Sequence, residues 1–121
     1  MRIALVSMAF LVSACAALAG DREDAERLRA EIIGLIGDAE CNNLVNCRVI
    51  GLGVRPCGGP EEYLAYSTWA RRDEIQTRAL EYNFLREELL SKERISGTCV
   101  VLPEPKAACI NRRCVVAPAD R

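Results

Sequence analysis

Seven cysteines in a chain of 121 residues are the feature that most constrains its fold. Cys15 lies inside an apolar N-terminal segment, and the other six follow in two clusters of three. An even number of cysteines in a small exported chain is typical of a disulfide framework. We therefore expect three disulfides among these six residues, which are Cys41, Cys47, Cys57, Cys99, Cys109 and Cys114.

The pairing of these cysteines is left open by the sequence. Disulfides between the two clusters would close long loops and restrict the unfolded chain most, and each would stabilise the fold by roughly 2–4 kcal/mol. A local bridge such as Cys41–Cys47 is sterically allowed as well. Metal binding is the weaker alternative, because the chain has no C-x-x-C pair and zinc ribbons usually carry short paired spacings. We expect no metal and no cofactor.

The N-terminal segment predicts export. Met1-Arg2 gives a positive start, an apolar run follows, and Ala17-Leu18-Ala19 before Gly20 fits the small-x-small site of a signal peptidase. Residues 1–19 would then be a signal peptide, and residues 20–121 a single disulfide-rich domain. The N-terminal run is too short to serve as a transmembrane helix.

A lipoprotein signal is the competing interpretation of the same segment. The run Val12-Ser13-Ala14-Cys15 resembles a bacterial lipobox, in which residues 1–14 are removed and the cysteine becomes lipidated. Both interpretations place the folded part outside the cytoplasm, in the periplasm or the extracellular space. A membrane would be reached only through a lipid on Cys15.

The charge balance and the absence of histidine exclude several functions. The net charge is −1 and the chain contains no histidine. Without a basic face the chain has no electrostatic footprint for nucleic acid. Without histidine it has no Ser-His-Asp or Cys-His nucleophile and no imidazole metal ligand.

Apolar periodicity predicts an α+β domain. Apolar residues recur at three- and four-residue steps over residues 21–38 and 71–94, which indicates two helices. Strands are expected over residues 48–54 and 98–102, and a hairpin over 107–110 and 114–116 around Asn111-Arg112-Arg113. We expect a three- or four-stranded, mainly antiparallel sheet packed with the two helices.

The segment between the first predicted strand and the second helix is the candidate binding loop. Two prolines bracket Cys57-Gly58-Gly59, which excludes regular structure there, and a disulfide at Cys57 would hold the loop rigid. A rigid loop lowers the ordering cost of binding, and tyrosine is a favoured interface residue. We expect at least two of Tyr63, Tyr66 and Trp69 to lie in the core. The candidate binding residues are Arg55, Pro56, Gly58, Gly59, Pro60, Tyr63 and Tyr66.

The cysteine spacing and this loop together resemble a group of small exported bacterial proteins and lipoproteins. The resemblance rests on Cys41-x5-Cys47, on the run Pro56-Cys57-Gly58-Gly59-Pro60-x-x-Tyr63-x-x-Tyr66-Ser67, and on Cys99, Cys109 and Cys114. It covers nearly the whole mature chain. It implies export and an ordered disulfide framework, and it implies no activity, because the group is uncharacterised.

The sequence also contains residues that could suggest catalysis, redox activity, phosphate binding or an acidic partner. Glu61 and Glu62 follow the loop, and paired carboxylates serve some small hydrolases as acid and base. Redox activity is disfavoured, because Cys57 lacks a second cysteine two residues on. Gly58-Gly59 lacks the context of a phosphate-binding loop. Arg112-Arg113 fits a solvated turn better than a site for an acidic partner.

We therefore expect an exported, non-catalytic binding or inhibitor-like module of the cell envelope. Its partner would be an unknown protein or a cell-wall component. A small carboxylate-dependent hydrolase and a structural envelope lipoprotein are the alternatives.

Overall fold

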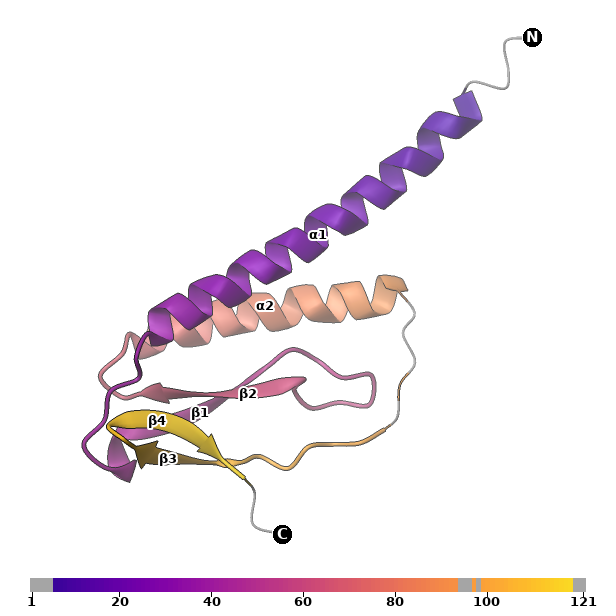
Figure 1. Cartoon of the computed structure of the whole chain (residues 1–121). Coiled ribbons are helices and arrows are strands. Elements are labelled where there is room, and N and C mark those ends of the chain that lie inside the picture. Colours follow the sequence, from indigo (N-terminus) through magenta and orange to yellow (C-terminus); the bar gives the residue numbers. More distant parts are fainter. Residues whose placement is uncertain (1–5, 94–96, 98, 119–121) are drawn as a thin grey trace.

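The computed structural model describes residues 6–93, 97 and 99–118, with side chains described from residue 20 onward. Two helices, two antiparallel strand pairs and a short 3-10 turn make up this part of the chain (Figure 1). The elements are α1 (Val6–Ile36), η1 (Leu44–Asn46), β1 (Cys47–Leu52), β2 (Glu62–Ser67), α2 (Arg72–Glu93), β3 (Lys106–Ile110) and β4 (Arg113–Ala117).

These elements form three layers. The β1–β2 pair lies between the two helices on one side and the β3–β4 pair on the other (Figure 1). The α+β class, the two helices and the antiparallel strands are confirmed, and the four strands form two separate pairs rather than one continuous sheet. The Cys47–Cys114 disulfide between β1 and β4, together with packing, holds the two pairs together in place of a shared hydrogen-bond ladder.

The β1–β2 pair is two-sided because successive strand residues face opposite ways. Ile50 lies opposite Leu64 in the register, and both pack against the cluster formed with the helices. Cys47 and Ala65 belong to the opposite face, where they pack with residues of β3 and β4. The pair therefore separates a main core under the helices from a second core built around disulfides.

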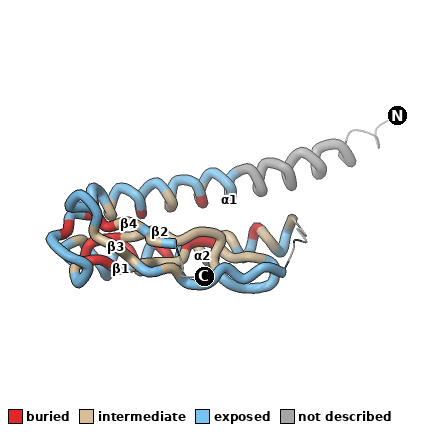
Figure 2. The backbone as a smooth tube through the Cα atoms, turned by 60° about the horizontal axis from the view of Figure 1, so that its bottom comes forward, coloured by how far each residue is buried: buried red, intermediate tan, exposed pale blue. Residues whose placement is uncertain are grey.

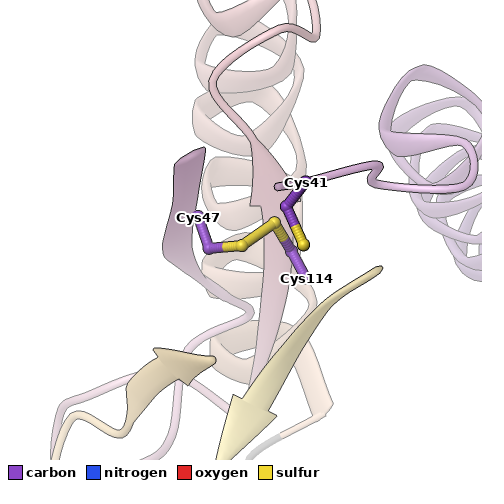
Figure 3. Close-up of side chains that lie close together, drawn as sticks. All are labelled: Cys41, Cys47 and Cys114. Atoms are coloured by element: carbon purple, nitrogen blue, oxygen red, sulfur yellow. A yellow bond between two sulfur atoms is a disulfide. The ribbon is translucent and has the colours of Figure 1, made fainter. Parts of the chain in front are cut away.

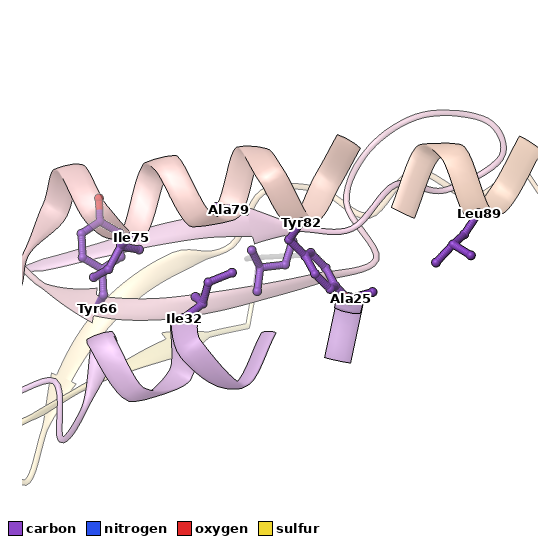
Figure 4. Packing of buried hydrophobic residues seen from close by; sticks show 8 residues of the cluster. Ala25, Ile32, Tyr66, Ile75, Ala79, Tyr82 and Leu89 are labelled. Atoms are coloured by element: carbon purple, nitrogen blue, oxygen red, sulfur yellow. The ribbon is translucent and has the colours of Figure 1, made fainter. Parts of the chain in front are cut away.

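The main core lies where the helices meet β1 and β2, and it combines aliphatic residues with Tyr66 and Tyr82. Its fully buried side chains come from α1 (Ile32), β1 (Leu52) and α2 (Ile75 and Leu89). In Figure 4, Ile32 points from α1 toward α2 and the strands, while Ile75 and Leu89 lie far apart along the facing side of α2. In Figure 2, α1 is exposed along most of its described length and buried only at isolated positions. Amphipathic packing thus fixes both helices.

Both predicted helices are present. The first is the C-terminal part of α1, which ends where Gly37 adopts a left-handed conformation with φ +56° and donates its N–H to Ile33 O at 3.0 Å. Gly37 therefore terminates the helix, as glycine in a left-handed conformation commonly does. No helix within the described residues is long and apolar enough to span a membrane. The side chain of Cys15 lies outside the described residues, so signal cleavage and lipidation stay predictions.

The strand predicted over 98–102 is wrong for residues 99–102, and residue 98 lies outside the described residues. Among the described residues no strand pairs with this β-branched run, and the two prolines that follow cannot donate backbone hydrogen bonds. Strand β2 takes the place next to β1 instead. We did not predict β2, because Tyr63 and Tyr66 were assigned to the candidate binding loop.

Candidate binding surface

Three disulfides connect the two cysteine clusters. They join Cys41 to Cys109, Cys47 to Cys114 and Cys57 to Cys99, across sequence separations of 68, 67 and 42 residues. The local alternative Cys41–Cys47 is not formed. Such a framework fits the oxidising, non-cytoplasmic environment that the sequence predicts.

Three of these sulfurs lie close enough to resemble a metal site. The Sγ atoms of Cys41, Cys47 and Cys114 lie within 4.8 Å of one another, and all three residues are buried (Figure 3). Each sulfur is already bonded to another in a disulfide, so none is a thiolate available to a cation. The three sulfurs lie close together because two disulfides are neighbours in the same core, and they do not form a set of metal ligands.

The loop that joins β1 to β2 is exposed and internally hydrogen-bonded. Arg55 N donates to Gly59 O at 2.9 Å, and Gly58 N donates to Arg55 O at 3.0 Å. Gly58 and Gly59 adopt φ values of +95° and +81°, which residues with a Cβ rarely take. The Cys57–Cys99 disulfide ties the tip of this turn to the chain that leads into β3. The loop therefore has one defined conformation.

Arg55 braces the loop from within. Its Nε donates to Pro60 O at 3.1 Å, and its Nη1 lies 3.5 Å from Val100 O. At the base of the loop, Gly53 N donates to the Asn83 side-chain oxygen of α2 at 2.7 Å. We therefore assign Arg55 a structural role in the loop, where the sequence predicted a binding residue.

Exposed apolar side chains lie beside the loop, and they are not among the candidate binding residues that we predicted from the sequence. Val100, Val101 and Leu102 are exposed, and a Cβ built on Gly59 would lie 3.6 Å from Val101 Cγ1. These residues form an apolar run in the sequence, from which we predicted a strand. We call residues 56–59 together with residues 100–102 the pinned-loop surface.

The three aromatic residues separate in space. Residues three apart on a strand face opposite sides, so Tyr63 and Tyr66 point away from each other across β2. Tyr66 is 4% exposed and lies in the main core, which removes it from the predicted binding loop. Tyr63 is half-buried, and Trp69 is 57% exposed beyond the end of β2. Of the three, only Tyr66 is fully buried in the core, whereas we expected at least two of them there.

The paired glutamates hold the two helices. Glu61 Oε1 accepts from Arg86 Nη2 of α2 at 2.8 Å, and Glu62 Oε1 accepts from Arg29 Nε of α1 at 2.6 Å. The hydrogen bond to Glu62 raises the pKa of Arg29 while burial opposes it, and Glu61 acts on Arg86 in the same way. This geometry gives each carboxylate a clamping role and provides no acid–base pair.

The arginines at the β3–β4 turn also hold the fold together. Asn111 and Arg112 adopt φ values of +52° and +62°, as a tight hairpin requires. Arg112 O accepts from Cys41 N at 3.1 Å, and Arg113 Nε donates to Asp38 O at 3.3 Å. The turn is therefore attached to the segment that follows α1.

No protein-family model, curated protein or solved structure matches this chain. The resemblance drawn from the cysteine spacing therefore stays a prediction, and the functional argument depends on the geometry of the chain itself.

Proposed function

We propose that this chain is an exported, non-catalytic binding module of the cell envelope that presents the pinned-loop surface to a protein partner. The observation that carries the proposal is an exposed loop that is already fixed by a disulfide, by two main-chain hydrogen bonds and by the Arg55 side chain. A loop held in one conformation does not lose conformational entropy again when it binds.

The chemistry of this surface indicates an apolar partner segment. Residues 56–59 and 100–102 carry no charged side chain, and Val100 and Val101 are 54% and 62% exposed. Burying their side chains on a partner would be favourable at roughly 25 cal/mol per Å² of apolar area. Gly58 and Gly59 let a partner backbone approach closely, as an inhibitor-like contact would require.

Export places the module in the periplasm or outside the cell. Three disulfides add stability there that its small hydrophobic core does not supply. A lipid on Cys15 would anchor the module to a membrane, and cleavage before Gly20 would release it.

Site-specific photo-crosslinking in cells that export the protein tests the proposal. A photo-reactive residue at Val101 should form an adduct with one partner, whereas the same residue at Thr77 should not. Thr77 is a suitable control because it is exposed on α2, away from the pinned-loop surface. With the purified partner, Val101→Asp should weaken binding by about tenfold or more, as expected for a charge placed in an apolar contact, and Thr77→Asp should leave it unchanged.

Two results would contradict the proposal. One is a partner that crosslinks equally from both positions and binds Val101→Asp as tightly as the unchanged chain. The other is hydrolase turnover by the purified protein that disappears in Glu61→Gln, which would favour the enzyme alternative.

A further inference from the structure

A cleft runs along the junction of α1 and α2, apart from the pinned-loop surface. Its volume is about 700 Å³, within the range of roughly 300–1,000 Å³ for small-molecule sites. Ala25 and Ala30 are small residues of α1 that line it, and Tyr82 of α2 and Glu61 line it from other elements. The cleft is therefore formed by three separate segments of the chain.

Tyr82 places an unpaired hydroxyl in this cleft. Its side chain belongs to the buried core, with the residue only 7% exposed, and lies beside Ala25 (Figure 4). No hydrogen bond among the described residues uses its hydroxyl, and none of their fully buried polar atoms lacks a partner. The hydroxyl must therefore be accessible, and it opens into the cleft that Tyr82 lines.

The charged groups around Tyr82 offer both donors and acceptors. Arg29 and Arg86 each donate Nε and Nη2 to a glutamate. Among the described residues no hydrogen bond uses the Nη1 of either arginine, so these donors stay available. Burial, and next the charge of Glu61, raise the pKa of the Tyr82 hydroxyl above its usual value of 10.0, which keeps it protonated at neutral pH.

The formal charges in the cleft cancel. Three arginines and three glutamates line it, namely Arg22, Arg29, Arg86, Glu26, Glu61 and Glu93. A phosphate or another anion would meet as many carboxylates as guanidinium groups, so it gains no net attraction. A lipid tail would have to strip water from charged groups, which is costly. The lining therefore favours a neutral ligand with many hydrogen-bonding groups.

We propose that this cleft binds a neutral, polyhydroxylated ligand of the saccharide class. A sugar hydroxyl donates and accepts at once, so neighbouring hydroxyls can accept from Arg29 or Arg86 and donate to Glu61. The Tyr82 hydroxyl does both as well. The small side chains of Ala25 and Ala30 leave room for a ring whose C–H face is apolar.

Nuclear magnetic resonance titration of the isotope-labelled protein tests this site. The probes are neutral trisaccharides of glucose, galactose, mannose and N-acetylglucosamine, with inorganic phosphate as the anionic comparison. At least one trisaccharide should give saturable amide shifts in residues 22–30 and 82–86. Tyr82→Phe should weaken that binding about three- to tenfold, as expected for one lost hydrogen bond. Tyr63→Phe is the matched control, since Tyr63 does not line the cleft, and it should bind unchanged.

Any of three outcomes would overturn the inference. These are the absence of saturable shifts with all four trisaccharides, saturable shifts with phosphate alone, and equal affinity for Tyr82→Phe at an unchanged melting temperature. Shifts confined to residues 56–59 and 100–102 would likewise place the ligand elsewhere. Protein crosslinking through Val101 is unaffected by these results, so the two proposals fail separately.

Discussion

Removing the exposed disulfide and a buried disulfide separately tests how this framework stabilises the domain. The perturbations are Cys57→Ala with Cys99→Ala, and Cys47→Ala with Cys114→Ala. The two bridges span 42 and 67 residues. From these spans, the chain-entropy relation gives a loss of stability of about 4.0 and about 4.4 kcal/mol at 25 °C when each bridge is removed. On loop length alone, the free energies of unfolding of the two variants therefore differ by only about 0.4 kcal/mol.

Burial should widen this difference. Cys47 and Cys114 are 4% and 7% exposed, in a core shared with Ala39 and Cys41, whereas Cys57 and Cys99 are exposed. Removing two buried sulfurs leaves unfilled space, which adds about 1–2 kcal/mol. We expect a total cost of about 5–6 kcal/mol for the buried bridge, comparable to the whole stability of a small domain.

Guanidinium chloride unfolding followed by far-ultraviolet circular dichroism measures both costs. A shift of the midpoint at constant slope reports a change in stability, and a change in slope would indicate an altered unfolded state. The expected order is that the variant without Cys47–Cys114 unfolds first. If the variant without Cys57–Cys99 is equally or more destabilised, the reasoning from burial is refuted.

Two further predictions concern single groups. Gly53→Ala should destabilise the fold by about 1–3 kcal/mol more than Gly58→Ala. The reason is that an added Cβ at Gly53 would lie 2.6 Å from the Glu61 side chain, whereas one at Gly58 would meet open space. Equal midpoints of unfolding in urea would contradict this prediction. Folding raises the pKa of the Tyr82 hydroxyl above its usual value of 10.0. The contribution of this group to the free energy of unfolding is therefore fully present below pH 10.0, and it is lost as the pH rises through the folded-state pKa. From pH 9 upward, the free energy of unfolding should therefore fall less steeply with pH in Tyr82→Phe than in the unchanged chain. Parallel curves for the two proteins would show that Tyr82 does not cause the pH dependence.

The parts that sequence could predict are those set by local chemistry. The helix expected over 71–94 is observed as α2 (Arg72–Glu93), because its apolar spacing matches the helical repeat over several turns. The hairpin expected around Asn111-Arg112-Arg113 is observed as β3 and β4. Its turn residues adopt positive φ, a conformation that asparagine tolerates well. Gly37 ends α1 for the same kind of local reason.

The parts that sequence could not predict depend on distant partners. A strand needs a neighbour, and nothing local indicates that Tyr63 and Leu64 pair with Gly51 and Ile50 of β1. Val100 and Val101 are β-branched residues typical of a strand, yet no strand in the part of the chain that the structure describes pairs with them. The pairing of the cysteines is equally non-local, because it follows from which segments the folded chain brings together. The cleft at the junction of α1 and α2 has no sequence signal either, since its residues are far apart in the chain.

Glu61, which immediately precedes β2, and Glu62, which begins it, show how one pair of residues connects these features. Their carboxylates reach different helices on the same side of the strand pair, Glu61 to α2 and Glu62 to α1. Partly exposed ion pairs of this kind contribute little stability, roughly 0–1 kcal/mol each. Their larger effect is positional, because both arginines also line the cleft and Glu61 closes the loop that carries Cys57. A pair that suggested acid–base catalysis in the sequence therefore sets the placement of the helices relative to the pinned loop, and with it the geometry of both proposed binding sites.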